Sequence, residues 1–257
     1  FEYPFPNCLI VQELVEGKSI FDEIISRGSE FGVEGLFKSD EMQRISTPIL
    51  ETLEEFRRKG FIHGDIKSEN IMLTSDMLPK LADFGLSHDA ADIVRQTTYS
   101  YSYRSPERIL NKQRTTQDDV WALGCTLYEA YTGLQLFNME GSIDKSDDTM
   151  KGLLNLMEQK IGRKIPKSWI EASGKRYSYF DYDRDSKTYS LKKPFLEDLK
   201  REATSIRDDI MAAAVEKGDD LLRADRLADV IEQMVTFNDR LRPCDLLRLP
   251  FFKGEGE

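Results

Sequence analysis

Residue types that build specialised sites are scarce in this sequence of 257 residues. Only two histidines occur, His63 and His88, which makes a histidine-rich metal centre implausible. The three cysteines, Cys8, Cys125 and Cys244, are odd in number and widely separated. That usage argues against a disulfide framework or a zinc site and indicates a reducing compartment. We therefore expect a cytoplasmic and/or nuclear protein.

The chain also lacks long apolar runs and an excess of positive charge. It has no run of 18 apolar residues and no recognisable signal peptide, so we expect no membrane contact. Its net charge of −10 argues against binding nucleic acid through the phosphate backbone. An acidic surface would suit a basic peptide partner, and it would equally serve solubility alone. With 40% hydrophobic residues the chain can bury a sizeable core, as one large domain or two small ones. Because it begins with Phe1, we expect a fragment of a longer protein.

Reactive side chains concentrate in one short stretch that reads Phe-Ile-His-Gly-Asp-Ile-Lys-Ser-Glu-Asn-Ile-Met-Leu at 61–73. It places Asp65, Lys67 and Asn70 on a loop between two apolar runs. A second motif, Leu-Ala-Asp-Phe-Gly at 81–85, adds Asp83, and a third, Tyr-Arg-Ser-Pro-Glu, occupies 103–107. Asp and Asn often do no more than cap turns. Three motifs in this order favour a functional site instead.

The three motifs resemble the catalytic loop, the start of the activation segment and its end in eukaryotic protein kinases. Phosphoryl transfer is mostly positioning and charge neutralisation. The resemblance implies that Asp65 accepts the proton of the substrate hydroxyl and that Lys67 reaches the γ-phosphate of ATP. Asn70 and Asp83 would supply the hard oxygen ligands that Mg²⁺ favours.

The resemblance covers nearly the whole chain and is to the large lobe of a kinase. It implies a mainly α (α+β) fold, helical with small β-hairpins, in which the small lobe is largely absent. Residues 1–18 would be the last small-lobe strand and the hinge, and residues 19–257 the large lobe with an insert at about 138–200. Several residues would then line the ATP site: the Glu13 carbonyl and Val15 amide at the adenine, Gln12 as gatekeeper, Ser19 near the ribose and Met72 as the floor.

Apolar spacing gives the expected helices and strands. A short helix is predicted from Ser19 to Arg27, and a longer one that starts with Ser39 or Asp40 as its N-cap and stops at Gly60. We also expect a buried helix over 118–132, an amphipathic helix over 224–235, a strand over 8–11 and a strand pair formed by 71–73 and 80–82.

The remaining implied roles are regulatory and structural. In the activation segment, from Asp83 to Glu107, Ser100 would bond to the catalytic loop and Arg104 belongs to the closing motif. Glu107 would form a buried ion pair with Arg242. Asp119 would hold the backbone of the catalytic loop from below, and His63 and Phe84 are the structural residues of the first two motifs.

Within the kinases, the arginine after Tyr103 and the long insert resemble the CMGC group of cyclin-dependent, mitogen-activated and splicing-factor kinases. Leu-Asn-Leu-Met-Glu-Gln-Lys-Ile-Gly at 154–162 and Ser-Gly-Lys-Arg-Tyr-Ser-Tyr-Phe at 173–180 are similar to segments of the LAMMER and SR-protein kinases. The branch of dual-specificity tyrosine-regulated kinases is also similar. This resemblance implies a serine/threonine kinase, with possible activity on tyrosine, and a basic protein substrate such as an Arg/Ser-rich splicing factor.

The chain departs from the kinase pattern in several places. Gly64 replaces the arginine that usually precedes the catalytic aspartate, Ser68 a common proline, and Tyr101 an arginine of many CMGC relatives. Control through phosphorylation of the activation segment is therefore in doubt. The sequence has no glycine-rich phosphate loop and no Val-Ala-Ile-Lys strand. We expect a small lobe upstream in the full-length protein and weak activity of this chain alone. The alternative function is a pseudokinase that serves as a docking module.

Overall fold

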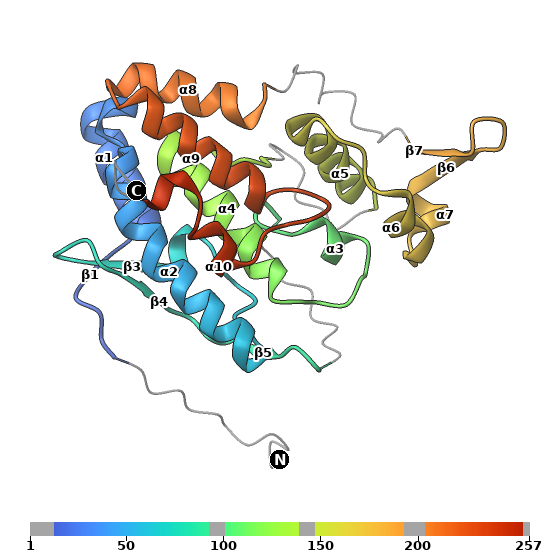
Figure 1. Cartoon of the computed structure of the whole chain (residues 1–257), viewed down its shortest axis with the longest axis horizontal. Coiled ribbons are helices and arrows are strands. Elements are labelled where there is room, and N and C mark those ends of the chain that lie inside the picture. The colour runs from blue at the N-terminus through green and yellow to red at the C-terminus, as the bar shows by residue number, and fades with distance from the viewer. Residues whose placement is uncertain (1–12, 93–100, 139–146, 193–203, 254–257) are drawn as a thin grey trace, which may run out of the picture.

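The computed structural model describes residues 13–92, 101–138, 147–192 and 204–253. In these residues helices dominate and the strands form three small antiparallel sheets, so the mainly helical fold is confirmed (Figure 1). The first sheet has the order β1 (Gly17–Ser19), β3 (Ile71–Thr74), β4 (Pro79–Leu81). The other two pair β2 (Phe61–Ile62) with β5 (His88–Asp89) and β6 (Phe180–Asp183) with β7 (Thr188–Leu191). The predicted strand at 8–11 lies outside the described residues.

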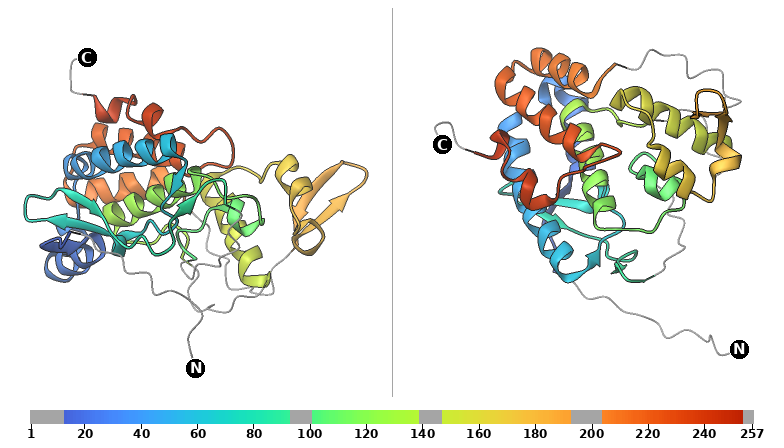
Figure 2. Two further views of the ribbon diagram at one scale, coloured as in Figure 1. Left: turned by 90° about the horizontal axis from the view of Figure 1, so that it is seen from below. Right: turned by 45° about the vertical axis from the view of Figure 1, so that its right-hand side comes forward.

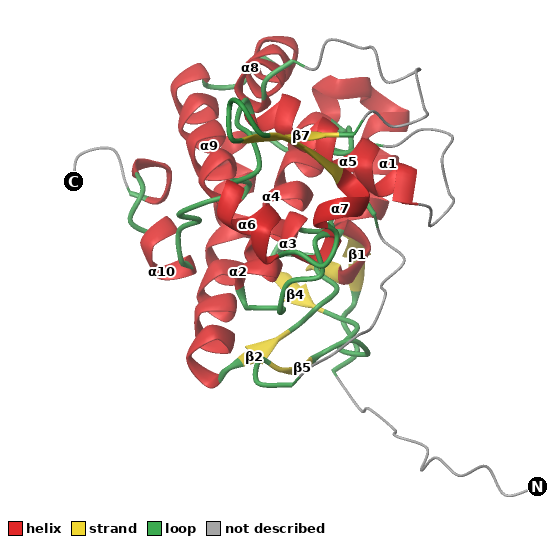
Figure 3. Cartoon of the chain, turned by 90° about the vertical axis from the view of Figure 1, so that its right-hand side faces the viewer, coloured by secondary structure: helices red, strands yellow, loops and turns green. Residues whose placement is uncertain are grey.

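The helices are α1 (Ile20–Phe31), α2 (Ser39–Lys59), α3 (Pro106–Ile109), α4 (Gln117–Thr132), α5 (Asp147–Ile161), α6 (Lys167–Ala172), α7 (Arg176–Tyr179), α8 (Ile206–Lys217), α9 (Leu221–Met234) and α10 (Pro243–Leu246), with short 3-10 turns η1 (Gly32–Gly35), η2 (Ser68–Asn70) and η4 (Pro250–Phe252). The four predicted helices correspond to α1, α2, α4 and α9, and the described residues form further helices between and after them. Figure 3 shows β1, β4, β2 and β5 gathered at one end of the helical body. Among the described residues, no helix combines the length and apolarity needed to cross a membrane.

Helix α4 forms the centre of the core. Every residue from Asp118 to Thr132 is buried, as its all-round apolarity predicts, and the helix packs against α2, α8 and α9. Gly124 permits the close approach to α9, because a Cβ there would lie 2.9 Å from the Cβ of Met234 and 2.7 Å from Val235. This packing fixes the N-terminal end of α4, which carries two buried aspartates.

Helix α2 buries the predicted stripe of Met42, Ile45, Ile49 and Leu53, and it ends at Gly60, which adopts the left-handed conformation (φ 69°). Its N-cap prediction was wrong.

The capping residue of α2 is Lys38 rather than Ser39 or Asp40. The Lys38 amide donates to the Glu41 carboxylate over 2.9 Å. The Ser39 amide and hydroxyl instead donate to Asp219, at 2.8 and 3.1 Å, across a sequence separation of 180 residues. This long-range partner moves the start of the helix.

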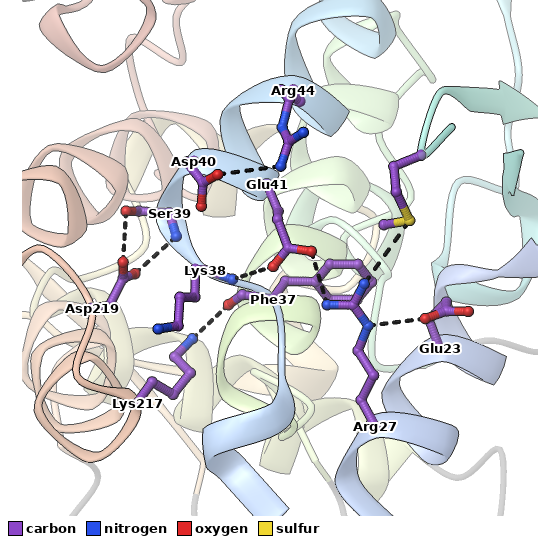
Figure 4. A network of polar contacts seen from close by, with 11 residues as sticks. Glu23, Arg27, Phe37, Lys38, Ser39, Asp40, Glu41, Arg44, Lys217 and Asp219 are labelled. Carbon is purple, nitrogen blue, oxygen red and sulfur yellow. Dashed lines mark hydrogen bonds and ion pairs between the residues drawn. The ribbon is translucent and has the colours of Figure 1, made fainter. Parts of the chain in front are cut away.

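A polar network joins α1, α2 and the end of α8 (Figure 4). Arg27 donates to Glu23 and Glu41 over 2.9 Å each, and its guanidinium lies 4.3 Å from the centre of the Phe37 ring. Buried Lys217 donates to the carbonyl oxygens of Phe37 and Tyr131, each over 2.7 Å. Burial lowers the pKa of Lys217 to about 7. The network therefore connects α1, α2 and the end of α8 to one another.

The region predicted as an insert contains α5, α6, α7 and the β6–β7 hairpin. The hairpin projects from the side of the molecule (Figures 1 and 2). Helix α6 attaches this region to the core, because the hydroxyl of its C-cap Ser173 donates to the Leu110 carbonyl over 2.9 Å and Lys112 lies 4.1 Å above the Trp169 ring. Trp169 also meets the Phe237 ring edge-on, with 6.4 Å between centroids.

Candidate active site

The loop between β2 and β3 brings three of the predicted site residues together. The Lys67 Nζ atom lies 3.1 Å from the Asp65 carboxylate. The Asn70 side-chain amide donates to both the carboxylate and the backbone carbonyl of Asp65, each over 2.9 Å. The side chains of Asp65 and Lys67 are only 12% and 19% exposed. An acid, a cation and an amide therefore meet in one partly shielded cluster.

The backbone of this loop is held from below by Asp119, in the first turn of α4. Its carboxylate accepts hydrogen bonds from the amides of His63 (2.7 Å) and Gly64 (2.9 Å), which confirms the predicted contact. Burial raises the pKa of Asp119 to about 7, and the two amide bonds act in the opposite direction. A single buried carboxyl group therefore holds two consecutive amides of the loop.

Gly64, next to Asp65, has a left-handed backbone with φ 82°. A Cβ at this position would lie 2.8 Å from the Leu86 carbonyl oxygen. No side chain fits there unless the backbone moves, so in this geometry residue 64 cannot supply a cation to the site.

The Asp-Phe-Gly motif packs directly against the loop. The Ala82 amide donates to the Asn70 carbonyl over 2.9 Å, which places Asp83 beside the cluster. Asp83 has a left-handed backbone (φ 60°), and its exposed carboxylate accepts a hydrogen bond from the Gly85 amide at 3.2 Å. Such a conformation in a non-glycine residue is uncommon and is often found at functional sites. The Phe84 ring lies 4.7 Å from the ring of His63, which is fully buried.

The residues predicted at the nucleotide are less closely grouped. Met72 is half-buried on β3, where it pairs with Ser19 of β1. Val15 is half-buried, and the Glu13 carboxylate lies 3.1 Å from Lys80. Gln12 lies outside the described residues.

Ser19, predicted to lie near the ribose, is the residue that caps helix α1. Its side chain is buried, accepts a hydrogen bond from the Asp22 amide (3.0 Å) and donates to the Asp22 carboxylate (2.7 Å). These contacts form the N-terminal cap of α1, which uses both the donor and an acceptor of the hydroxyl.

The closing motif of the activation segment is anchored to α4 by residues that the sequence analysis missed. The Tyr103 hydroxyl lies 3.0 Å from the Ser68 hydroxyl and donates to the buried Glu129. Burial raises the pKa of both Tyr103 and Glu129. The Ser105 hydroxyl donates to Asp118, one residue before Asp119. The sequence did hold a sign of this contact, because Glu129 is a carboxylate within an otherwise apolar stretch of α4 and a buried carboxylate needs a partner.

Arg104, the second residue of the closing motif, contacts neighbouring side chains. Arg104 lies 4.7 Å above the Tyr101 ring and 3.6 Å from the Met150 sulfur. Ser100, predicted to contact the catalytic loop, lies outside the described residues.

The predicted partner of Glu107 was also wrong. Glu107 pairs with Arg240 over 3.1 Å, and the Arg240 side chain is only 4% exposed. Arg242 is 53% exposed and bonds to Asp245 over 2.6 Å. The physical reason is local: Arg242 is the residue before α10, which begins at Pro243, and from there its side chain reaches Asp245 in the first turn of that helix. Arg240 is left to face the core.

Comparison with known proteins agrees with this geometry. The protein kinase domain family matches residues 3–252. A cyclin-dependent kinase 4 homolog from Caenorhabditis elegans is 32% identical over 133 residues, 51% of this chain and 31% of the relative. A probable serine/threonine-protein kinase dyrk2 from Dictyostelium discoideum is 34% identical over 144 residues, 55% of this chain and 15% of the relative. A probable serine/threonine-protein kinase PknB from Corynebacterium glutamicum is 32% identical over 137 residues, 51% of this chain and 20% of the relative. The matched region thus spans less than a third of each relative.

Proposed function

Because this chain belongs to the protein kinase family, we propose that it is the large lobe of a protein serine/threonine kinase. The reaction is transfer of the ATP γ-phosphoryl group to a hydroxyl of a protein substrate. One observation carries the proposal: Asp65, Lys67 and Asn70 converge within 3.1 Å contacts on a loop whose backbone is fixed by Asp119. A scaffold has no chemical need for this combination.

The contacts of each residue suit its proposed role. Asp65, oriented by Lys67 and Asn70, accepts the proton of the attacking hydroxyl. Lys67 lies beside it as a mobile cation for the charge that develops on the transferred group.

The donor set also fits Mg²⁺. Asn70 uses its amide nitrogen on Asp65, so its amide oxygen remains to bind the metal, together with the exposed carboxylate of Asp83. When bound, Mg²⁺ supplies neutralisation of the phosphate charge. Two protein ligands are enough, since Mg²⁺ keeps waters and phosphate oxygens as its other ligands.

The nucleotide site of this chain is half of a cleft. Glu13, Val15 and Met72 provide the adenine side, and we propose that a small lobe upstream in the full-length protein provides the phosphate side. The chain alone then binds MgATP weakly. A location in the cytoplasm, the nucleus or both follows from the reducing compartment that the cysteines indicate.

For the substrate, we propose a basic protein with serine or threonine acceptors, and Arg/Ser-rich segments as the first class to test. The net charge of −10 suits such a partner. The similarity to a cyclin-dependent kinase homolog and to dyrk2 supports the CMGC group, whereas the similarity to PknB shows that the match is not restricted to that group. Activity on tyrosine is a further part of the proposal.

The test is transfer of radiolabelled phosphate by the full-length protein to Ser, Thr and Tyr peptides, with and without neighbouring arginines. Asp65→Asn is expected to lower kcat by about 10²–10⁴. The matched control is Asp76→Asn, in the exposed turn after β3, which is expected to leave kcat unchanged. Full activity of Asp65→Asn would contradict the proposal, and absence of transfer by the wild type would favour a docking function.

A further inference from the structure

A small polar cavity lies beneath the catalytic loop, between that loop, α3 and the start of α4. It is lined by Gly64 and Asp65 from the loop, by Arg108 from α3 and by Asp118 and Asp119 from α4, with Tyr103, Ile66 and Ala122 completing the wall. Arg108 is therefore the cation that the described residues place at this cavity. It reaches the underside of the loop from a different segment of the chain.

The charge state of Asp119 matters to the loop because its two carboxylate oxygens each accept one backbone amide. A protonated carboxyl group would lose one acceptor oxygen. Burial raises the pKa of Asp119 to about 7, and the neighbouring Asp118 on the same helix raises it further. The group is thus poised between the two forms near neutral pH, and nearby cations decide which form prevails.

The charged groups around Asp119 come from every element packed there. Asp118 lies on its own helix, and Asp65 lies across the cavity. His63 supplies no positive charge near neutral pH, because burial lowers the pKa of its imidazole. The favourable charges are those of Arg108 on α3 and Arg114 in the segment before α4. Burial lowers the pKa of Arg108 to about 10, which leaves it cationic at neutral pH.

We propose that Arg108 is a positioning residue, which favours the ionised form of Asp119 and thereby holds the backbone of the catalytic loop in place. Residue 64 cannot provide this charge from within the loop, because it is a glycine, and a Cβ added there would collide with the Leu86 carbonyl oxygen. Arg108 provides it across the cavity instead. The effect on the rate of phosphoryl transfer rests on the proposed function, whereas the effect on Asp119 does not.

The direct test is a pH titration of the Gly64 amide by NMR in the full-length protein labelled with ¹⁵N-glycine. Because this amide donates to Asp119, its proton shift follows ionisation of that carboxyl group. Asp119→Asn removes the titration and so identifies the signal. Arg108→Gln is expected to move the midpoint to higher pH, since loss of a cation favours the neutral acid.

Lys112→Gln is the matched control for that titration. Lys112 lies four positions after Arg108, beyond the end of α3, and its ammonium group stands over the Trp169 ring rather than at the cavity. Its variant is expected to leave the midpoint unchanged. An unchanged midpoint in Arg108→Gln overturns the proposal.

A second variant keeps the test decisive if Arg108→Gln does not fold. The double variant Arg108→Gln/Asp119→Asn is then expected to fold, because it removes the uncompensated buried charge together with its partner. Failure of the double variant to fold overturns the proposal as well.

A kinetic measurement separates this inference from the proposed function. In the full-length protein, we compare kcat/KM of Arg108→Gln with that of the wild type at pH 6 and at pH 8. If the substitution raises the pKa of Asp119 by about one unit, the ratio of variant to wild type is about fivefold lower at pH 6, because less of Asp119 is then ionised in the variant. A ratio that does not vary with pH counts against Arg108. Absence of activity in the wild type refutes the proposed function and leaves the NMR result to decide the role of Arg108.

Discussion

Replacement of Arg240 tests the core of the structure at the point where the sequence analysis was wrong. Arg240 pairs with Glu107 over 3.1 Å and donates to the carbonyl oxygens of Gln117 and Thr236 over 2.9 Å each. With its side chain 4% exposed, its removal strands a carboxylate and two carbonyl groups. We expect Arg240→Met to lower the free energy of unfolding by about 3–5 kcal/mol. With an m-value of about 3 kcal/mol per M, the urea midpoint falls by about 1–2 M.

The assay is urea unfolding followed by tryptophan fluorescence, because Trp121 lies 5.0 Å from the Arg240 guanidinium. The matched control is Arg242→Met, which removes an exposed arginine two positions away and is expected to leave the midpoint unchanged. The double variant Glu107→Gln/Arg240→Met should be less destabilised than the sum of the single variants, since neither charge is then left alone. A loss in Arg242→Met equal to or larger than that in Arg240→Met would refute the assignment.

Three further changes are expected to have measurable effects on stability. Gly64→Ala should lower the free energy of unfolding by at least about 2 kcal/mol. Gly218→Ala should lower it less, because Gly218 shares the left-handed backbone but has open space around it. Chemical unfolding of both variants therefore separates the effect of the collision from that of the backbone strain. Lys217 has a folded-state pKa of about 7, below its unfolded value, so the unfolded state binds more protons above pH 7. The free energy of unfolding of the wild type should therefore rise by about 1–2 kcal/mol between pH 7 and pH 9 relative to that of Lys217→Met. A difference in free energy of unfolding that stays constant across that range would contradict the pKa. Tyr103→Phe removes the donor to buried Glu129 and should cost about 1–3 kcal/mol in the same unfolding assay, whereas a neutral effect would mean that the bond contributes nothing.

Local periodicity explains why much of the fold could be predicted. The stripe from Met42 to Leu53 and the all-round apolarity of α4 specify which faces are buried, and both are properties of short segments. The start of α2 could not be predicted in the same way. Its position depends on Asp219, which meets Ser39 only after the chain has folded.

The candidate site shows the same division. Asp65, Lys67 and Asn70 lie within six positions, so their convergence follows from one loop and could be predicted. The choice between Arg240 and Arg242 as the partner of Glu107 could not, because two arginines two positions apart are equivalent until the start of α10 turns one of them outward.

The sequence could not predict the charged residues beneath the catalytic loop, for a different reason. The role inferred for Arg108 depends on a cavity formed by three separate segments of the chain.

The most direct test of the catalytic account is a crystal structure of the full-length protein with Mg²⁺ and a non-hydrolysable ATP analogue. The account predicts a metal ion about 2.0–2.1 Å from an oxygen of Asn70 and from the Asp83 carboxylate, with Asp65 facing the γ-phosphate. A nucleotide whose metal lies away from both side chains, with Asp83 still bonded only to the Gly85 amide, would contradict it.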